Sequence, residues 1–379
     1  MLNMSYINLT KTGFTETWEV IAMNVDGQYR IAGTRSYNPN GSNNFINRLW
    51  QSNDGGNTWI ENTTENIKDV RWGGGAIVIS NNGKDCVAIE SKGLYAFIWL
   101  SNDYGKHWTE NTQAGQKRWE GLAMSGDGQY LAAADFYGYI WLSNDRGKHW
   151  TENTQAGQKG WRGLAMSDDG QHLAALANNG RIWQSNDGGK HWSEKNTGDK
   201  IWMDIAMSAD GQYRAAVENS GRIWQSNDHG NTWSESMYVG PYILFHIVMS
   251  RDGQYRMVNT DRKKYIWQSH DYGVNWKEYT EAGEKNWRDI AMTGDGRYRT
   301  AVVEDGNIWN WEFFSLCNYY KRMQAQPTTN VVGEVCCPEG ASLTLQETTT
   351  ENNVNEHNKF LQKIISKTRP GITNRLCGL

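Results

Sequence analysis

The sequence predicts an all-β fold, a seven-bladed β-propeller whose blades are four-stranded antiparallel sheets. The first observation is an Asp-containing box, such as "SNDYGKHW", whose six copies lie 41 to 43 residues apart except for one interval of 49. A second pattern, "WxxIAMSxDGQY", occurs seven times when two degenerate copies are counted. A third, "IWQS" with its variants, also occurs seven times. A period of roughly 40 residues indicates a propeller, and the count predicts seven blades.

Each repeat has the local pattern of four short strands. In the repeat that begins at Trp202, we expect strands over residues 202–208, 213–218, 223–226 and 232–236, separated by turns rich in Gly, Asn and Asp. One such sheet cannot bury both of its faces, so the repeats must stack around an axis to form a core.

The tryptophans belong to the repeat itself. Seven lie in the third strands, six in the boxes, six open or precede the first strands, and Trp311 completes the twenty. Because their positions follow the period, we interpret them as packing residues between blades and not as a platform for a sugar or a cofactor.

The two ends of the repeat region are expected to pair. The seventh repeat ends at "NIWNWEFF" without a box or a fourth strand, whereas residues 6–18 parallel the segment 108–119 that joins one blade to the next. Residues 5–10 are therefore predicted to form the outer strand of the last blade, which removes an exposed sheet edge.

Composition narrows the function classes. The 379 residues have a net charge of -4, so nucleic acid and anionic lipid are poor default partners. No targeting segment or membrane span is recognised, which predicts a soluble protein in the cytoplasm or within a particle. Cys317, Cys336, Cys337 and Cys377 lack the spacing of a zinc site and are interpreted as reduced thiols. No metal or cofactor is expected.

The box carries a resemblance to a known family. The residues of the motif S-x-D-x-G-x-[TH]-W, as at 226–233, resemble the Asp-box of the BNR repeat found in sialidases, sortilin-type receptor ectodomains and the photosystem II assembly factor. The resemblance covers residues 5–311, and the high similarity among the copies is closest in style to microbial and viral Asp-box proteins. An Asp in such a turn can accept hydrogen bonds from the following amides, so a structural role is predicted for Asp54, Asp103, Asp145, Asp187, Asp228 and Asp271.

A sialidase-like enzyme is the alternative function. The resemblance implies that such an enzyme has an arginine triad, a Tyr/Glu nucleophile pair and an Asp acid/base. The segment "YRIA" at 29–32 is similar to a sialidase signature, but "QYR" recurs at Arg214 and Arg256 and "RYR" at Arg299, which indicates repeat consensus. The blades also lack the divergence that one asymmetric active site needs. We therefore expect no catalytic residue, and keep a glycoside hydrolase or carbohydrate-binding propeller as the alternative.

A binding role is favoured by the loops that vary between repeats. Those joining strands two and three acquire basic and aromatic residues at Arg35, Tyr37, Phe45, Arg48, Tyr95, Phe136, Tyr137, Arg262, Lys263 and Lys264. Four lysines precede the first strand at the same position, namely Lys117, Lys159, Lys200 and Lys285, with Glu120, Arg162 and Arg288 just inside. Together these residues could hold an anionic group or an acidic segment of a partner. Tolerated loop insertions and solvated lysines are the alternative interpretation.

The last part of the chain differs from the repeats. We expect a propeller over residues 1–314 and an irregular extension over 315–379 with one short amphipathic helix. Phe360, Leu361, Ile364 and Ile365 could share one face of that helix, which is too short to be stable alone and is expected to dock. The sequence thus predicts a non-catalytic interaction or structural module, anchored by its tail and loops to other proteins of a larger assembly such as a virion.

Overall fold

The computed structural model describes residues 6–7, 10–13, 15–37, 45–67, 70–72, 76–90, 95–261, 265–314, 334–336 and 342–344. The chain forms two compact units. One runs from Asn8 to Trp311, and the other combines Met1–Ile7 with Glu312–Leu379. In the second unit, β32 (Glu334–Cys336) pairs antiparallel with β33 (Ser342–Thr344). The predicted anchor residues at 360–365 lie outside the described residues.

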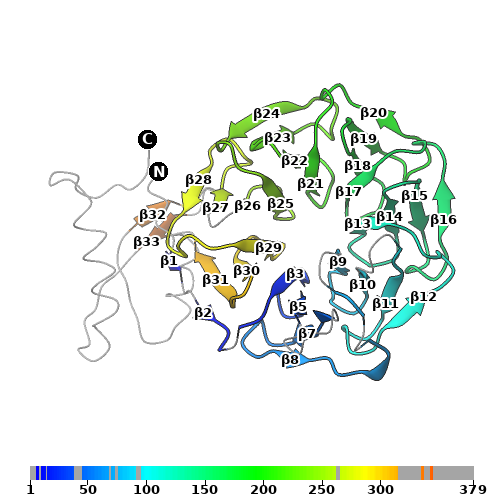
Figure 1. The fold of residues 1–379 in the computed structure, drawn as a ribbon. Helices are drawn as coiled ribbons and strands as arrows, with labels where there is room; N and C mark the ends of the chain where they lie inside the picture. The colour runs from blue at the N-terminus through cyan, green and yellow to red at the C-terminus, as the bar shows by residue number, and fades with distance from the viewer. Residues whose placement is uncertain are drawn as a thin grey trace. The chain divides into compact units, whose positions relative to one another are not determined.

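Seven antiparallel sheets are arranged around a central axis in the first unit, which confirms the predicted seven-bladed propeller (Figure 1). The innermost strands are β3 (Trp18–Met23), β9 (Ile77–Ile79), β13 (Trp119–Met124), β17 (Trp161–Met166), β21 (Trp202–Met207), β25 (Leu244–Met249) and β29 (Trp287–Met292). The second strands are β4 (Arg30–Thr34), β10 (Cys86–Ile89), β14 (Leu131–Asp135), β18 (Leu173–Ala177), β22 (Arg214–Glu218), β26 (Arg256–Thr260) and β30 (Tyr298–Val303). The third strands are β7 (Leu49–Ser52), β11 (Ile98–Ser101), β15 (Ile140–Ser143), β19 (Ile182–Ser185), β23 (Arg222–Ser226), β27 (Ile266–Ser269) and β31 (Ile308–Phe314). The outer strands are β8 (Ile60–Glu61), β12 (Thr109–Asn111), β16 (Thr151–Asn153), β20 (Ser193–Glu194), β24 (Ser234–Tyr238) and β28 (Lys277–Tyr279).

The N-terminal segment supplies the outer strand of the seventh blade, as predicted. In β2 (Thr10–Lys11), Thr10 lies opposite Asn310 and Lys11 opposite Trp309 of β31. The two residues of β1 (Tyr6–Ile7) continue this pairing at the end of β31. The first and last repeats are thereby joined by backbone hydrogen bonds, and β31 has no open edge where these strands pair.

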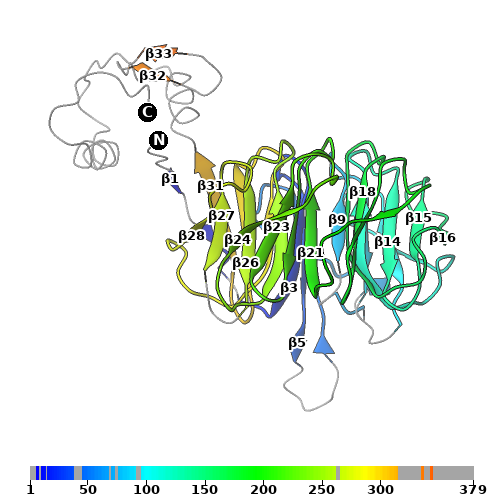
Figure 2. The same cartoon turned by 90° about the horizontal axis from the view of Figure 1, so that it is seen from above.

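The meander gives the propeller two different faces. The loops that lead into the innermost strands and the turns between second and third strands lie on one side, which we call the loop face. The turns between first and second strands and the Asp-boxes lie on the other side, the box face. On the loop face, β5 (Ser36–Tyr37) and β6 (Phe45–Ile46) form a hairpin, and β5 projects beyond the blades (Figure 2).

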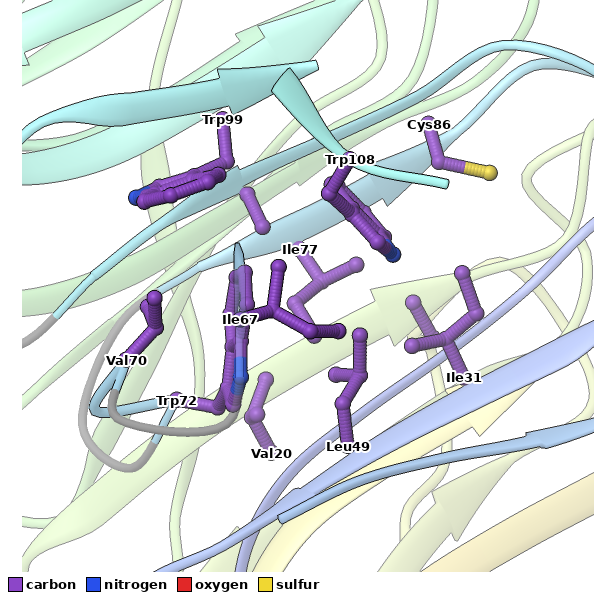
Figure 3. Packing of buried hydrophobic residues seen from close by; sticks show 12 residues of the cluster. Val20, Ile31, Leu49, Ile67, Val70, Trp72, Ile77, Cys86, Trp99 and Trp108 are labelled. Atoms are coloured by element: carbon purple, nitrogen blue, oxygen red, sulfur yellow. The ribbon is translucent and has the colours of Figure 1, made fainter. Parts of the chain in front are cut away.

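Tryptophans fill the space within and between blades. In six blades the Trp at or just before the innermost strand meets the third-strand Trp at ring-centre distances of 6.0 to 6.3 Å, with steeply inclined planes. Between blades 1 and 2, Trp72 and Trp108 pack with Val20, Ile31 and Leu49 of the preceding blade (Figure 3). Such pairs contribute about 0.5–1.5 kcal/mol beyond the area they bury, so the repeated Trp positions hold the blades together.

Two kinds of residue pair connect neighbouring blades near the box face. Where the first or second residue of the second strand is Arg, the buried guanidinium donates to an amide oxygen in the third strand of the preceding blade. Arg214 donates to Gln184 at 3.0 Å, and Arg256 to Gln225 at 3.0 Å. Arg299 donates to Gln268 in the same way, and Arg30 donates to Asn310 at 2.6 Å. Each Arg also donates its Nε–H to a glycine carbonyl of its own turn.

The same junction is apolar between blades 2, 3 and 4. Leu131 and Leu173 replace the arginines, and Leu100 and Leu142 replace the glutamines. Each leucine of the third strand packs against the cluster that contains its partner. The box glycine lies over the junction in both cases. Gly189 has a φ of 86°, and a Cβ there would lie 2.5 Å from Leu142, so only glycine fits.

Each Asp-box is a closed hydrogen-bonded turn. In the box of blade 4, Ser185 Oγ donates to Asp187 at 2.7 Å, and the His191 amide donates to the same oxygen at 2.9 Å. His191 Nδ1 lies 2.5 Å from the other carboxylate oxygen. Burial opposes the charge, but these hydrogen bonds outweigh it and lower the pKa of Asp187 to about 2. The other five aspartates accept equivalent bonds from the residue four positions later.

Candidate functional site

A β-bulge near the start of the innermost strand places one variable side chain of each of six blades in the central channel. In these six strands the pairing register shifts after the first residue. A bulge re-aims the extra residue, and here its side chain lines a cavity of about 410 Å³ between the innermost strands. We call these bulged residues the mouth ring, which consists of Glu19, Glu120, Arg162, Met203, Phe245 and Arg288.

Three of the four charged residues in the mouth ring form ion pairs. Arg288 lies 3.0 Å from Glu19 of the next blade and 3.6 Å from Glu304 of its own blade. Glu120 lies 2.9 Å from Arg118. These contacts keep the Glu19, Arg288 and Glu120 side chains in place at the mouth.

Arg162 has the same position in blade 4 as Arg288 in blade 7, but neither of the acidic partners. Met203 stands in the next blade where Arg288 has Glu19, and Asn178 stands where Arg288 has Glu304. Within the described ranges, the Arg162 guanidinium forms no ion pair or side-chain hydrogen bond. A half-buried cation thus faces the cavity beside the apolar Met203 and Phe245.

One side of the channel is bridged by two aspartates and a histidine, which occupy the position after the mouth ring. Nδ1 of His246 lies 3.6 Å from Asp204 and 3.8 Å from Asp289. Burial opposes the histidine's charge, but Asp289 and Asp204 outweigh it and raise the pKa of His246 to about 9, against a smaller effect of Arg162. The histidine is therefore a cation at neutral pH.

Both aspartates also accept backbone amides. Asp204 accepts the Ile205 amide at 2.8 Å and that of Ile247 in the next blade at 3.0 Å. Asp289 accepts the amides of Ile290 and Ile21, both at 2.8 Å. Burial raises the pKa of Asp289. Each carboxylate satisfies channel-facing N–H groups that the inner edge of a propeller leaves without a strand partner.

The opposite side of the channel lacks such carboxylates. Blades 2, 3 and 4 have Ala76, Gly121 and Gly163 at the position of the aspartates. Leu122 and Leu164 occupy the same register as Ile205, so their amides also point toward the channel. No side-chain carboxylate of this position can cap those two N–H groups. The described residues contain no group of three or more His, Cys, Asp or Glu side chains that could hold a metal ion.

Aromatic residues are exposed around the mouth on the loop face. Tyr95 and Tyr137 are each 63% exposed and Tyr238 is 50% exposed, and all three lie at strand ends or turns of this face. The Arg118 guanidinium lies 4.1 Å from the ring centre of Phe136 and 5.1 Å from that of Tyr137, and it donates to the Tyr137 hydroxyl at 2.7 Å. Arg118, Phe136 and Tyr137 contact one another and form a surface of one guanidinium and two aromatic rings, which we call the blade 3 platform.

The four predicted lysines lie on tryptophans. The ammonium groups lie 4.1 to 4.5 Å from the ring centres of the third-strand Trp in their own blades. Lys159 and Lys285 also donate to the carbonyls of Ala156 and Ala282. The positions predicted for a basic rim are thus occupied by cation–π contacts that cover the Trp pairs.

The remaining predicted residues lie in several environments. Arg35 is exposed, and Arg48 lies 2.6 Å from Glu16. The side chains of Tyr37 and Phe45 and all of residues 262–264 lie outside the described residues. Sequence reasoning did not single out Glu19, Met203, Asp204, Phe245, His246 or Asp289. The sequence does mark these residues, because they occupy the two variable positions of the pattern "WxxIAM". Those two positions differ from blade to blade, while the residues on either side of them are largely constant.

The comparisons with known proteins agree with this geometry. The family model of the BNR-Asp box repeat matches residues 266–279, which comprise β27, the sixth box and β28. The chain is an Asp-box repeat β-propeller. Comparison of the sequence with curated proteins finds no match. No helix among the described residues is long and apolar enough to cross a membrane.

Solved structures with the same architecture include proteins of different functions. YCF48 bound to D1 peptide is 16% identical to this propeller, with a TM-score of 0.58 over 81% of this chain and 96% of that chain. The GH74 xyloglucanase from Xanthomonas campestris is 13% identical, with a TM-score of 0.61 over 88% of this chain and 58% of that chain. At these identities the similarity demonstrates a shared fold and leaves the function to the site.

Proposed function

We propose that this Asp-box propeller is a non-catalytic binding module that captures a segment of a partner protein on its loop face, over the mouth of the channel. The observation that carries the proposal is the contrast between the two faces. The loop face has exposed tyrosines, the blade 3 platform and an asymmetric mouth ring, whereas the box face repeats one hydrogen-bonded turn. Exposed Tyr and Arg are the residue types enriched at protein interfaces.

The carboxylates of the channel support binding and not glycoside hydrolysis. A glycosidase needs one carboxyl group to protonate the leaving group and a second to act as nucleophile or base. Here Glu19 and Glu120 are ion-paired to arginines, while Asp204 and Asp289 accept backbone amides beside His246. A peptide ligand is also compatible with the fold, because YCF48 has been solved with a peptide bound.

Selection of peptides from a random display library against the full chain tests the proposal. We expect enriched peptides whose binding is lost in Tyr137→Ala combined with Arg118→Ala. The matched control is Ile60→Ala, because Ile60 is as exposed as Tyr137 but lies on the box face. If Ile60→Ala abolished peptide binding and the Tyr137→Ala, Arg118→Ala variant did not, peptides would bind the box face and the proposal would be wrong. Hydrolysis of xyloglucan or of a sialoside by the wild-type chain would contradict the non-catalytic role.

The anchoring role of the tail is a separate proposal that rests on the sequence. Phe360→Asp with Ile364→Asp in the full chain removes the apolar face of the predicted helix. We expect the double variant to melt like the wild type and to lose incorporation into its assembly. Equal incorporation of variant and wild type, measured by co-purification from the native source, would contradict the anchor.

A further inference from the structure

We propose that the channel mouth binds a carboxylate that sits next to an apolar side chain, as at the C-terminus of a peptide, with Arg162 as its partner. This inference rests on the proposed capture of a protein segment and names the chemistry that the segment presents. It follows from three observations on neighbouring innermost strands.

The first observation is the missing partner of Arg162. The equivalent Arg288 has two acidic partners, one in the next blade and one in its own, and both are replaced at Arg162 by Met203 and Asn178. An arginine at this position can thus be paired with acidic residues of the propeller, as Arg288 is, but Arg162 in blade 4 is not. A half-buried guanidinium with five donors gains most from a bidentate carboxylate.

The second observation is the absence of carboxylates from the innermost strands beside Arg162. Glycines at 121 and 163 stand where Asp204 and Asp289 stand on the other side of the ring. A Cβ at 121 would lie 2.5 Å from the Arg162 carbonyl oxygen, so the two strands approach closely there and leave no room for an acidic side chain. A ligand carboxylate can therefore supply the negative charge that the neighbouring strands do not give Arg162.

The third observation is the apolar surface beside the cation. Met203 and Phe245 complete the mouth ring on the side that follows Arg162. A ligand that places an apolar side chain on these residues keeps its carboxylate directed at blade 4. The cavity of about 410 Å³ has space for one terminal residue.

The test compares N-acetyl-leucine with N-acetyl-leucinamide, which differ only in the carboxylate, by isothermal titration of the full chain. N-acetyl-aspartate α-amide, whose single free carboxylate is on the side chain, distinguishes an acidic side chain from a C-terminus. We expect N-acetyl-leucine to bind at least about tenfold more tightly than the amide and the aspartate derivative, as is typical for one charge-assisted pair.

Variants assign the binding to Arg162. Arg162→Met should reduce the affinity for N-acetyl-leucine about tenfold or more, and Arg162→Lys should restore part of it. Met203→Glu should also abolish binding, because it gives Arg162 the partner that Glu19 gives Arg288. The control is Arg181→Met, which removes a loop-face arginine of the same blade that is paired with Asp199 and Glu194.

Three results would overturn the inference: equal binding of acid and amide, no binding of either, or full binding by Arg162→Met. None of them affects the peptide selection that tests loop-face binding through Tyr137 and Arg118, so the two proposals fail separately. Unchanged melting temperatures of Arg162→Met and Met203→Glu would show that lost binding is not lost folding.

Discussion

The two arcs of the propeller hold neighbouring blades with different chemistry. In the apolar arc, which comprises the junctions among blades 2, 3 and 4, leucine packs against leucine, as at Leu142 and Leu173. In the polar arc, which comprises the junctions from blade 4 to blade 7, a buried arginine donates to a glutamine, as at Arg214 and Gln184. Burial lowers the pKa of Arg214 to about 10, which shows how strongly the site opposes the charge that it nevertheless contains.

The comparison shows that the residue at the start of a second strand has to match the third-strand residue that it contacts in the preceding blade. Similarity between whole repeats does not ensure that match. The backbone register is the same in both arcs, because in the first six blades the first residue of the second strand pairs with the serine that ends the third strand. A buried guanidinium is tolerated only where an amide and a carbonyl accept its hydrogen bonds, and a leucine only where its neighbour is also apolar. Repeats of nearly identical sequence are therefore not interchangeable.

The largest effect is expected from mixing the two chemistries. Leu173→Arg places a guanidinium against Leu142 in a fully buried position, and an uncompensated buried charge costs about 3–5 kcal/mol. We expect a large fall in the urea midpoint and in the melting temperature. A loss of less than about 1 kcal/mol would show that the pairs do not have to match.

The matched control is the double variant Leu142→Gln with Leu173→Arg, which copies the junction of blades 4 and 5. We expect it to recover most of the stability that Leu173→Arg loses. A double-mutant cycle measures this coupling directly. Simple additivity of the two substitutions would contradict the pairing rule.

The boxes should not distinguish the arcs. Asp187→Ala in the apolar arc and Asp228→Ala in the polar arc both remove a carboxylate that accepts the amide four residues later. We expect each to cost about 1–2 kcal/mol of unfolding free energy with peptide binding intact. Because the pKa of Asp187 is lowered to about 2, its contribution is present above the unfolded pKa of 3.8 and is lost as the pH falls toward 2.

The two arcs also differ within the channel, because His246 lies between Asp204 and Asp289 on the side of the polar arc. Its pKa rises from 6.5 to about 9 on folding, so its contribution is complete below pH 6.5 and is lost as the pH rises through 9. After allowance for its 44% exposure, we expect about 1 kcal/mol. Wild-type stability should fall between these pH values relative to His246→Gln. Parallel pH profiles of the two proteins would contradict the bridge.

The smallest effect is expected at the lysines. Lys159→Met and Lys200→Met remove cation–π contacts at 4.1 and 4.4 Å from Trp183 and Trp224, one in each arc. An exposed contact of this kind contributes about 0.5–1 kcal/mol. Equal small losses of melting temperature are expected. A loss of N-acetyl-leucine binding without a change in melting would instead return these lysines to the binding site.

The fold could be predicted from the sequence because its signals are local or periodic. Turn residues, strand patterns and the Trp positions recur every 41 to 43 residues, with one interval of 49, and the missing seventh box pointed to closure by the N-terminal segment. The arginine of "QYR" was correctly attributed to the repeat. Its role was not found, because its partner lies about 30 residues earlier in another blade.

The site was predicted only in part. Arg162, Arg288 and Glu120 were expected just inside the four lysines, and their side chains line the channel cavity. Met203, Phe245 and His246 were missed, because a bulge decides that they enter the channel, and a bulge has no signature in a single repeat. The lysines were assigned to a rim because the sequence does not show that an ammonium group two residues before a Trp lies on the Trp pair.

The N-terminal strand of the seventh blade has a consequence for synthesis of the chain. Thr10 and Lys11 leave the ribosome before the residues of the first blade, but their partners Asn310 and Trp309 emerge about 300 residues later. During that interval the segment has no strand to pair with, while complete blades can already stack behind it. The ring therefore closes only after translation has passed the seventh blade, and a nascent chain that stalls earlier exposes the Trp-lined flank of its last finished blade to aggregation.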